Sequence, residues 1–347
     1  MSTLSELAEK FESLLERLPS AIRGPVQREW QPLSELFIKR RAPRLLIVGR
    51  KGDLFLRTTL LPASPFAGTP PTELFQPWQS VRHLGRLEYA LALDHPHAAK
   101  QAIETAPPDC FLLLFTGNSP EDERSLQLLD ELYHSDSVLY QEAAPVIAVT
   151  ESSEITRETV LQALSPGLRK ALAAVVPAGA RGTLLATIAR QLPQSARLEF
   201  ARFAGETTVQ KEIAQTLVSS TTAVCAAIGT QPIPLADFPI LSSLQILMIA
   251  GIIQISGRQW RMHTIARFLG ALGLNLGAGL LLREGARAAI KIFPGFGNAI
   301  SGAMAGTGTY AIGLAATAYF IDHLTIAEAR KQLHFRFGKK KKALPPA

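Results

Sequence analysis

The sequence lacks the residues on which several classes of protein depend. Cysteine occurs only twice among 347 residues, at Cys110 and Cys225, so neither a disulfide framework nor a cysteine metal site is available. Asp94, His95 and His97 lie close together, but no further histidine cluster accompanies them, which favours a polar loop over a metal site. No nucleophile-elbow pattern is present. The sequence therefore contains no sign of an intact catalytic centre.

Net positive charge is scarce except at the C-terminal end, because Lys and Arg balance Asp and Glu over the rest of the chain. The formal net charge is +7, and the segment from Arg330 to Lys342 alone holds seven Lys and Arg residues and no acid. The pI therefore reflects a tail and not a basic groove, and no nucleic-acid partner is predicted. The tail is instead a candidate site for anionic lipid, with a solvated tail as the alternative. Its four clustered cations are Lys339, Lys340, Lys341 and Lys342.

Residues 1–40 form a separate N-terminal segment with an amphipathic helix. Apolar residues recur at helical spacing from Leu4 to Leu18, and Thr3 with Glu6 resembles a capping box. Four glutamates interrupt the stretch from Met1 to Arg23, so it is not a signal peptide. The apolar stripe could dock on its own protein, on a partner helix or on a membrane surface, and the first of these is favoured.

Short apolar runs alternate with helical patterns between residues 41 and 198. The first run, Leu45 to Gly49, ends in glycine and is typical of a buried parallel strand that enters a turn. This alternation favours a three-layer α/β domain. Further strands are expected at Tyr89 to Leu93, Cys110 to Phe115, Val146 to Val149 and Ala173 to Val176. The expected helices include Glu121 to Tyr133, Thr156 to Leu164 and Leu184 to Leu192.

The character of the chain changes between residues 199 and 330, where charges thin out and alanine and glycine rise. The 20 uncharged residues Phe238 to Gly257 would make a helix about 30 Å long, enough to cross hydrocarbon. Small residues one turn apart, such as Gly273 and Gly277, allow helices to pack closely. We expect an all-α, glycine-rich, apolar domain that is membrane-associated, with a soluble bundle as the alternative. Residues 331–347 form the basic tail.

A glycine-containing loop follows the first apolar run and consists of Gly49, Arg50, Lys51 and Gly52. This loop and the order of strands and helices resemble a small GTPase of the Era and dynamin-related kind, with a P-loop NTPase fold. In that family the loop ends in a glycine, a lysine that reaches the phosphates and a Ser or Thr that binds magnesium. Here the corresponding residues are Leu54, Phe55 and Leu56.

Later family motifs are also incomplete. Asp94 and Pro96 match the strand-end motif, but His97 replaces the glycine that senses the γ-phosphate. The residues from Thr150 to Ser153 replace the guanine-specificity motif, and Val176 to Ala180 resembles the final loop. The resemblance therefore implies a degenerate nucleotide site with little or no GTP hydrolysis. No cofactor is predicted, with GTP binding kept as an alternative. The site would consist of Gly49, Arg50, Lys51, Gly52 and Asp94.

The apolar half carries a second resemblance. The segments Pro232 to Asp237, Leu241 to Gln245, Gly270 to Arg283 and Pro294 to Gly297 are similar to the YcjF-like domain of unknown function. In bacterial proteins that domain often follows an Era-type GTPase domain, and it is considered membrane-associated. The resemblance implies a place on the cytoplasmic side of a bacterial inner membrane.

Taken together, these patterns predict a membrane-associated pseudo-GTPase that acts as a binding or scaffolding module. Its partner would be a nucleotide-competent GTPase or a second copy of the chain. Two alternatives stay open: a GTP-binding protein with slow hydrolysis through an atypical phosphate loop, and a soluble adaptor with a helical bundle.

Overall fold

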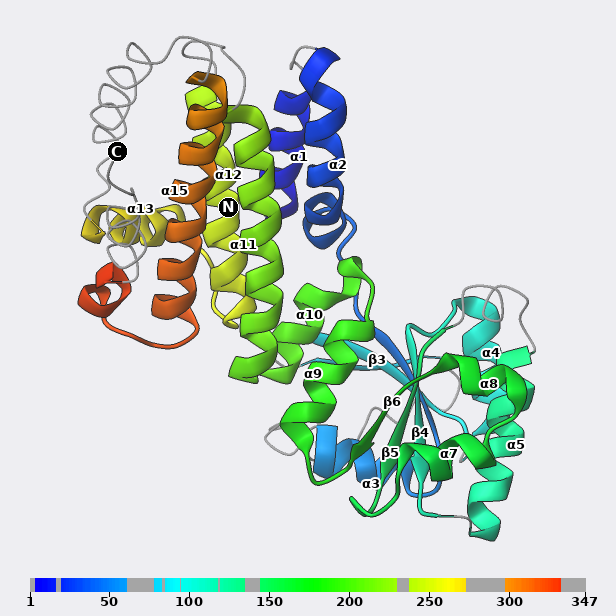
Figure 1. Ribbon diagram of the computed structural model, residues 1–347. Coiled ribbons are helices and arrows are strands. Elements are labelled where there is room, and N and C mark those ends of the chain that lie inside the picture. The colour runs from blue at the N-terminus through cyan, green and yellow to red at the C-terminus, as the bar shows by residue number, and fades with distance from the viewer. Residues whose placement is uncertain are drawn as a thin grey trace, which may run out of the picture. The chain divides into compact units, whose positions relative to one another are not determined.

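The chain folds into two compact units (Figure 1). The computed structural model describes residues 4–16, 20–60, 78–82, 85–93, 95–117, 119–134, 144–229, 237–272 and 297–331. One unit comprises residues 41–209, and the other combines residues 1–40 with residues 210–347. The N-terminal segment therefore belongs to the same unit as the apolar helices, although more than 160 residues separate them in sequence.

The unit of residues 41–209 is built on a six-stranded sheet with the order β2-β3-β1-β4-β5-β6. All neighbouring strands are parallel except β2 and β3, which are antiparallel. The strands are β1 (Arg44–Val48), β2 (Gln79–Arg82), β3 (Arg86–Leu91), β4 (Cys110–Phe115), β5 (Val146–Thr150) and β6 (Leu172–Pro177). The expected α/β class is thus present, as a mostly parallel sheet with helices.

Helices cover both faces of this sheet. The crossovers from β3 to β4, β4 to β5 and β5 to β6 run in the same direction, and parallel crossovers are right-handed, so their helices share one face. These are α4 (Pro96–Thr105), α5 (Pro120–His134), α7 (Arg157–Ala163) and α8 (Pro166–Ala171). The crossover from β1 runs the other way. On the opposite face lie α3 (Gly52–Phe55), the π-helix η1 (Leu56–Leu60), α9 (Arg181–Gln191) and α10 (Gln194–Ala204).

The sequence located most of these elements. The strand expected at Cys110 to Phe115 has those bounds, and the helices expected at 121–133 and 156–164 match α5 and α7 within two residues. Strand β2 was not expected, because it is a four-residue edge strand without an apolar run. The expected domain boundary at residue 198 falls within α10, which packs on β3. A Cβ on Gly85 would lie 2.2 Å from the Glu199 carbonyl oxygen, so this glycine permits the close approach.

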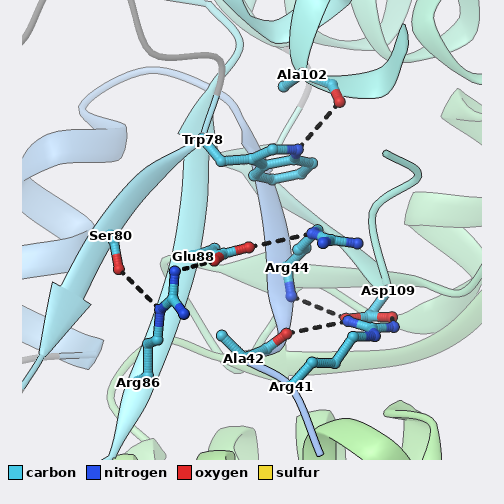
Figure 2. A network of polar contacts seen from close by, with 9 residues as sticks. All are labelled: Arg41, Ala42, Arg44, Trp78, Ser80, Arg86, Glu88, Ala102 and Asp109. Atoms are coloured by element: carbon cyan, nitrogen blue, oxygen red, sulfur yellow. Dashed lines mark hydrogen bonds and ion pairs between the residues drawn. The ribbon is translucent and has the colours of Figure 1, made fainter. Parts of the chain in front are cut away.

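The amino edge of the sheet is closed by charged residues (Figure 2). Arg41 pairs with Asp109 through Nη1 and Nη2, and the Arg44 amide donates to the same carboxylate at 2.9 Å. Hydrogen bonding to Asp109 raises the pKa of Arg41. Glu88 accepts from Arg44 at 3.1 Å and pairs with Arg86 at 2.8 Å. These pairs connect the start of β1 to β3 and to the residue before β4.

The second unit is helical. Its helices are α1 (Leu4–Leu15), α2 (Ser20–Phe37), α11 (Thr207–Gly229), α12 (Asp237–Ile255), α13 (Met262–Ala271) and α15 (Gly297–Phe320). The stripe Leu4, Ala8, Phe11 and Leu15 is buried, and α1 packs on α12. Of the three partners considered for this stripe, the structure therefore shows the chain's own helices. Helix α13 begins within the stretch from Gly257 to Arg267, which interrupts the apolar runs.

Helix α12 is the centre of this unit. From Leu247 to Ile253 every side chain is buried, and α1, α13 and α15 all pack on the helix. A helix that is apolar on all sides is expected at such a position. Within the described ranges, no helix combines the length and the hydropathy needed to cross a bilayer.

Candidate functional site

The candidate site is the carboxyl edge of the parallel sheet. The chain leaves β1 toward β3 on one side and returns from β3 past β1 to β4 on the other. In open α/β sheets, ligands bind beyond the carboxyl ends of the strands at such a reversal of direction. The loop from Gly49 to Gly52 begins directly after β1 and therefore lies at this point.

Gly49 occupies a position that only glycine can fill. Its φ is +144°, a region that L side chains rarely adopt. A Cβ there would lie 2.5 Å from the Leu114 Cβ and 2.9 Å from the Leu114 carbonyl oxygen on the neighbouring strand. The glycine is thus required by packing against β4, whether or not a ligand approaches the loop.

The two cations of the loop have different environments. Arg50 forms an ion pair with Glu121 in the first turn of α5, and this interaction raises the pKa of Arg50. Lys51 is exposed, and its backbone φ is +57°, an uncommon value for a residue other than glycine. The resemblance assigned Arg50 to a phosphate site, but its guanidinium is paired with the carboxylate of Glu121.

The three residues that the resemblance aligns with the end of a phosphate-binding loop are apolar. The Leu54 side chain is 52% exposed, whereas Phe55 and Leu56 are only 8% and 1% exposed. A phosphate site needs a cationic side chain and a hydroxyl ligand for magnesium at the last two positions. Two buried apolar side chains can supply neither. Gly52 is buried and begins α3, which has only four residues before it continues as η1.

The start of α5 beside Arg50 is held by a capping box. The Asp122 amide donates to Ser119 Oγ at 3.1 Å, and the Ser119 amide donates to the Asp122 carboxylate at 2.9 Å. The same carboxylate accepts from the Thr116 amide at 3.0 Å and from its hydroxyl at 2.9 Å. Burial raises the pKa of Asp122, but the hydrogen bonds from Thr116 and Ser119 lower it by more, so the net direction is downward.

Arg181 connects α9 to the end of η1 and to Glu206. It begins α9, and its Nε donates to the Thr59 carbonyl oxygen at 2.9 Å near the end of η1. The same guanidinium pairs with Glu206. Sequence reasoning missed Arg181 and Glu121, because the partners of these charges are distant in the chain and no motif links them.

The segment after β5, which the resemblance aligned with a guanine-specificity motif, forms hydrogen bonds within itself and to the residue after β6. Thr150 is buried, and its hydroxyl donates to the Ser152 carbonyl oxygen at 2.9 Å. The Glu154 amide donates to Ser152 Oγ at 3.1 Å, and the Ala178 amide donates to the Thr150 carbonyl oxygen at 2.8 Å. The polar groups named here therefore find their partners within the two turns that follow β5 and β6.

Of the predicted site residues, the structure places Gly49, Arg50, Lys51 and Gly52 together at the end of β1. Asp94 lies outside the described residues, as do Lys339, Lys340, Lys341 and Lys342. His97 lies exposed in the first turn of α4. In the part of the chain that the structure describes, no three His, Cys, Asp or Glu side chains form a group that could hold a metal ion.

Comparison with known proteins adds no relative. No family model, no curated protein and no solved structure matches the chain. At the carboxyl edge, the described residues include the Arg50–Glu121 ion pair, the exposed Lys51 and the exposed apolar side chain of Leu54.

Proposed function

We propose that this chain is a pseudo-GTPase: a GTPase-like α/β unit that hydrolyses little or no GTP and serves as a binding module beside a membrane-associated helical unit. The likeness to a GTPase rests on the order of the elements and on the glycine turn after β1. The proposal of lost hydrolysis rests on the residues that follow this turn.

The burial of Phe55 and Leu56 carries the proposal. A working phosphate loop would need a cation at position 55, where the phenyl ring of Phe55 is only 8% exposed. Burying an unpaired charge at such a position is strongly unfavourable. The loop also cannot easily release Arg50 for a phosphate, because the pair with Glu121 would have to break. Both observations support the proposal that this edge no longer hydrolyses GTP.

The exposed Leu54 supports a protein partner at this edge. It lies in α3, directly after the loop that carries Arg50 and Lys51, so an apolar contact would have charged groups beside it, as at the centre and rim of many interfaces. We propose a nucleotide-competent GTPase or a second copy of this chain as the partner. Sedimentation of the wild type and of Leu54→Glu separates these: self-association that the variant abolishes identifies the second copy.

Calorimetric titration of the full chain with GTP and GDP in the presence of magnesium tests the loss of nucleotide binding. We expect no saturable heat at millimolar nucleotide. Micromolar binding that is weakened by Lys51→Gln and not by the exposed Lys170→Gln would overturn the proposal. That result would favour the alternative of a GTP-binding protein with slow hydrolysis.

A further inference from the structure

The turn between α12 and α13 is strongly basic. Arg258, Arg261 and Arg267 are all exposed, and the exposed His263 lies among them. The sequence has no acidic residue from 238 to 283, so no neighbour on these elements offsets the charge. The cluster is distant in sequence from Lys339 to Lys342, and its residues lie in the described turn and in α13.

The orientation of α13 is fixed by its buried side. The Phe268 ring lies 5.6 Å from the Tyr319 ring and 5.1 Å from the Phe320 ring of α15, measured between centroids. Ile265 is also buried. Because residues 265 and 268 face inward, Arg267 lies on the outer face of α13. Arg261 is the N-cap residue with extended backbone, so it precedes the first turn of the helix, and its side chain is exposed.

The first two polar residues after α15 do not neutralise Arg258. Arg258 Nη2 donates to Nδ1 of His323 at 3.1 Å, and this neighbour is not acidic. The adjacent Asp322 pairs with Lys211 at 2.7 Å, so its charge is already used.

An exposed apolar side chain lies directly beside Arg261 in the chain. Met262 is 51% exposed, and in the described part of the chain it and Leu54 are the exposed large hydrophobic residues. Trp260 lies two residues earlier and is half-buried. Arginines combined with an exposed methionine and a tryptophan are typical of helices that lie at a lipid surface, where the cations meet headgroups and the apolar groups enter the acyl boundary.

Trp260 also lines a cavity of about 360 Å³ at the end of α12. Arg40 and Gln254 line the same cavity, and Arg40 Nη1 donates to Gln254 Oε1 at 2.7 Å. The cavity therefore places another cation and an indole beside the basic turn, in a recess of a size that admits a phosphate-bearing headgroup.

We propose that the α12–α13 turn is a binding surface for anionic phospholipid. Arg258, Arg261 and Arg267 contact the headgroups, and Met262 inserts among them. The exposed methionine favours lipid over nucleic acid, since phosphate contacts to DNA or RNA need no apolar side chain. This inference deepens the membrane part of the proposed function and rests on it. It is independent of the nucleotide titration, so the two can fail separately.

Sedimentation of the full chain with vesicles tests the surface. The vesicles contain equal parts of phosphatidylcholine and phosphatidylglycerol, or phosphatidylcholine alone. We expect binding to the anionic vesicles, and a partition coefficient that falls roughly 30-fold in Arg261→Gln/Arg267→Gln, because two surface cations are lost. Met262→Ser should weaken binding further at high salt, where the charge contribution is screened.

The matched control is Lys100→Gln/Lys170→Gln, which removes two exposed charges from the α/β unit and should bind like the wild type. Absence of vesicle binding by the full chain would overturn the proposal. So would unchanged binding of the double arginine variant together with loss on replacing Lys339 to Lys342 by glutamine. Tighter binding to duplex DNA than to vesicles, lost in the same arginine variant, would assign the surface to nucleic acid instead. If soluble glycerol phosphate displaced the chain from the anionic vesicles as effectively as added unlabelled vesicles do, the ligand would be a free anion and not a lipid surface.

Discussion

Gly49 lies against Leu114 so closely that a Cβ on the glycine would be 2.5 Å from the leucine Cβ. The contact joins the turn after β1 to the carboxyl end of the neighbouring strand β4. In a nucleotide-binding loop, a first glycine is usually explained by the approach of phosphate. Here the packing of the sheet alone requires it, so its presence does not indicate that a nucleotide binds.

Gly49→Ala should therefore lower the stability of the α/β unit without any nucleotide present. Strain at positive φ and the clash with Leu114 together should cost about 2–4 kcal/mol of the free energy of unfolding. Urea denaturation followed by circular dichroism measures this. Gly179→Ala is the control, since nothing lies within 4 Å of its Cβ position. Equal stability of the two variants would show that the turn is not packed as described.

The capping box at α5 leads to a pH-dependent prediction. Asp122→Asn keeps the size of the side chain but removes the charge that accepts from Thr116 and Ser119. We expect a loss of about 2 kcal/mol at neutral pH, because hydrogen bonds to charged groups are among the stronger ones. Glu123→Gln, on the same turn but exposed, should change stability little.

The direction of the pKa shift determines how this loss depends on pH. The folded pKa of Asp122 is lowered, so the carboxylate stabilises the fold fully above the unfolded pKa and loses this effect as the pH falls through the folded pKa. The gap between wild type and Asp122→Asn should be constant from neutral pH to about pH 5 and shrink below about pH 4. A gap that widens with acid would contradict this assignment.

The sequence could predict the sheet because buried parallel strands are continuous apolar runs, as Cys110 to Phe115 shows. It could not predict β2, since an edge strand needs only backbone partners. The loop from Gly49 to Gly52 was recognisable from its glycines. The role of its charges was not, because the partner of Arg50 depends on where the fold places Glu121, 71 positions later.

Arg181 and Glu206 should be energetically coupled. Both side chains are partly exposed, at 26% and 37%, so a double-mutant cycle with Arg181→Met and Glu206→Gln should give about 1 kcal/mol of coupling. Arg181→Met should cost more than Glu206→Gln, because it also removes the donor to the Thr59 carbonyl. Additive effects of the two changes would mean that the pair is not formed in solution.

Phe11 tests whether the N-terminal helix is part of the helical unit. Its ring is 1% exposed and lies 4.6 Å from the Trp30 ring, measured between centroids. Phe11→Ala should therefore lower the free energy of unfolding by about 3–5 kcal/mol. Glu12→Ala alters the next, exposed position of the same helix and should have little effect. If α1 instead bound a partner or a membrane and did not pack on the unit, its apolar stripe would not stabilise the fold. Both variants would then have the same urea midpoint of unfolding as the wild type.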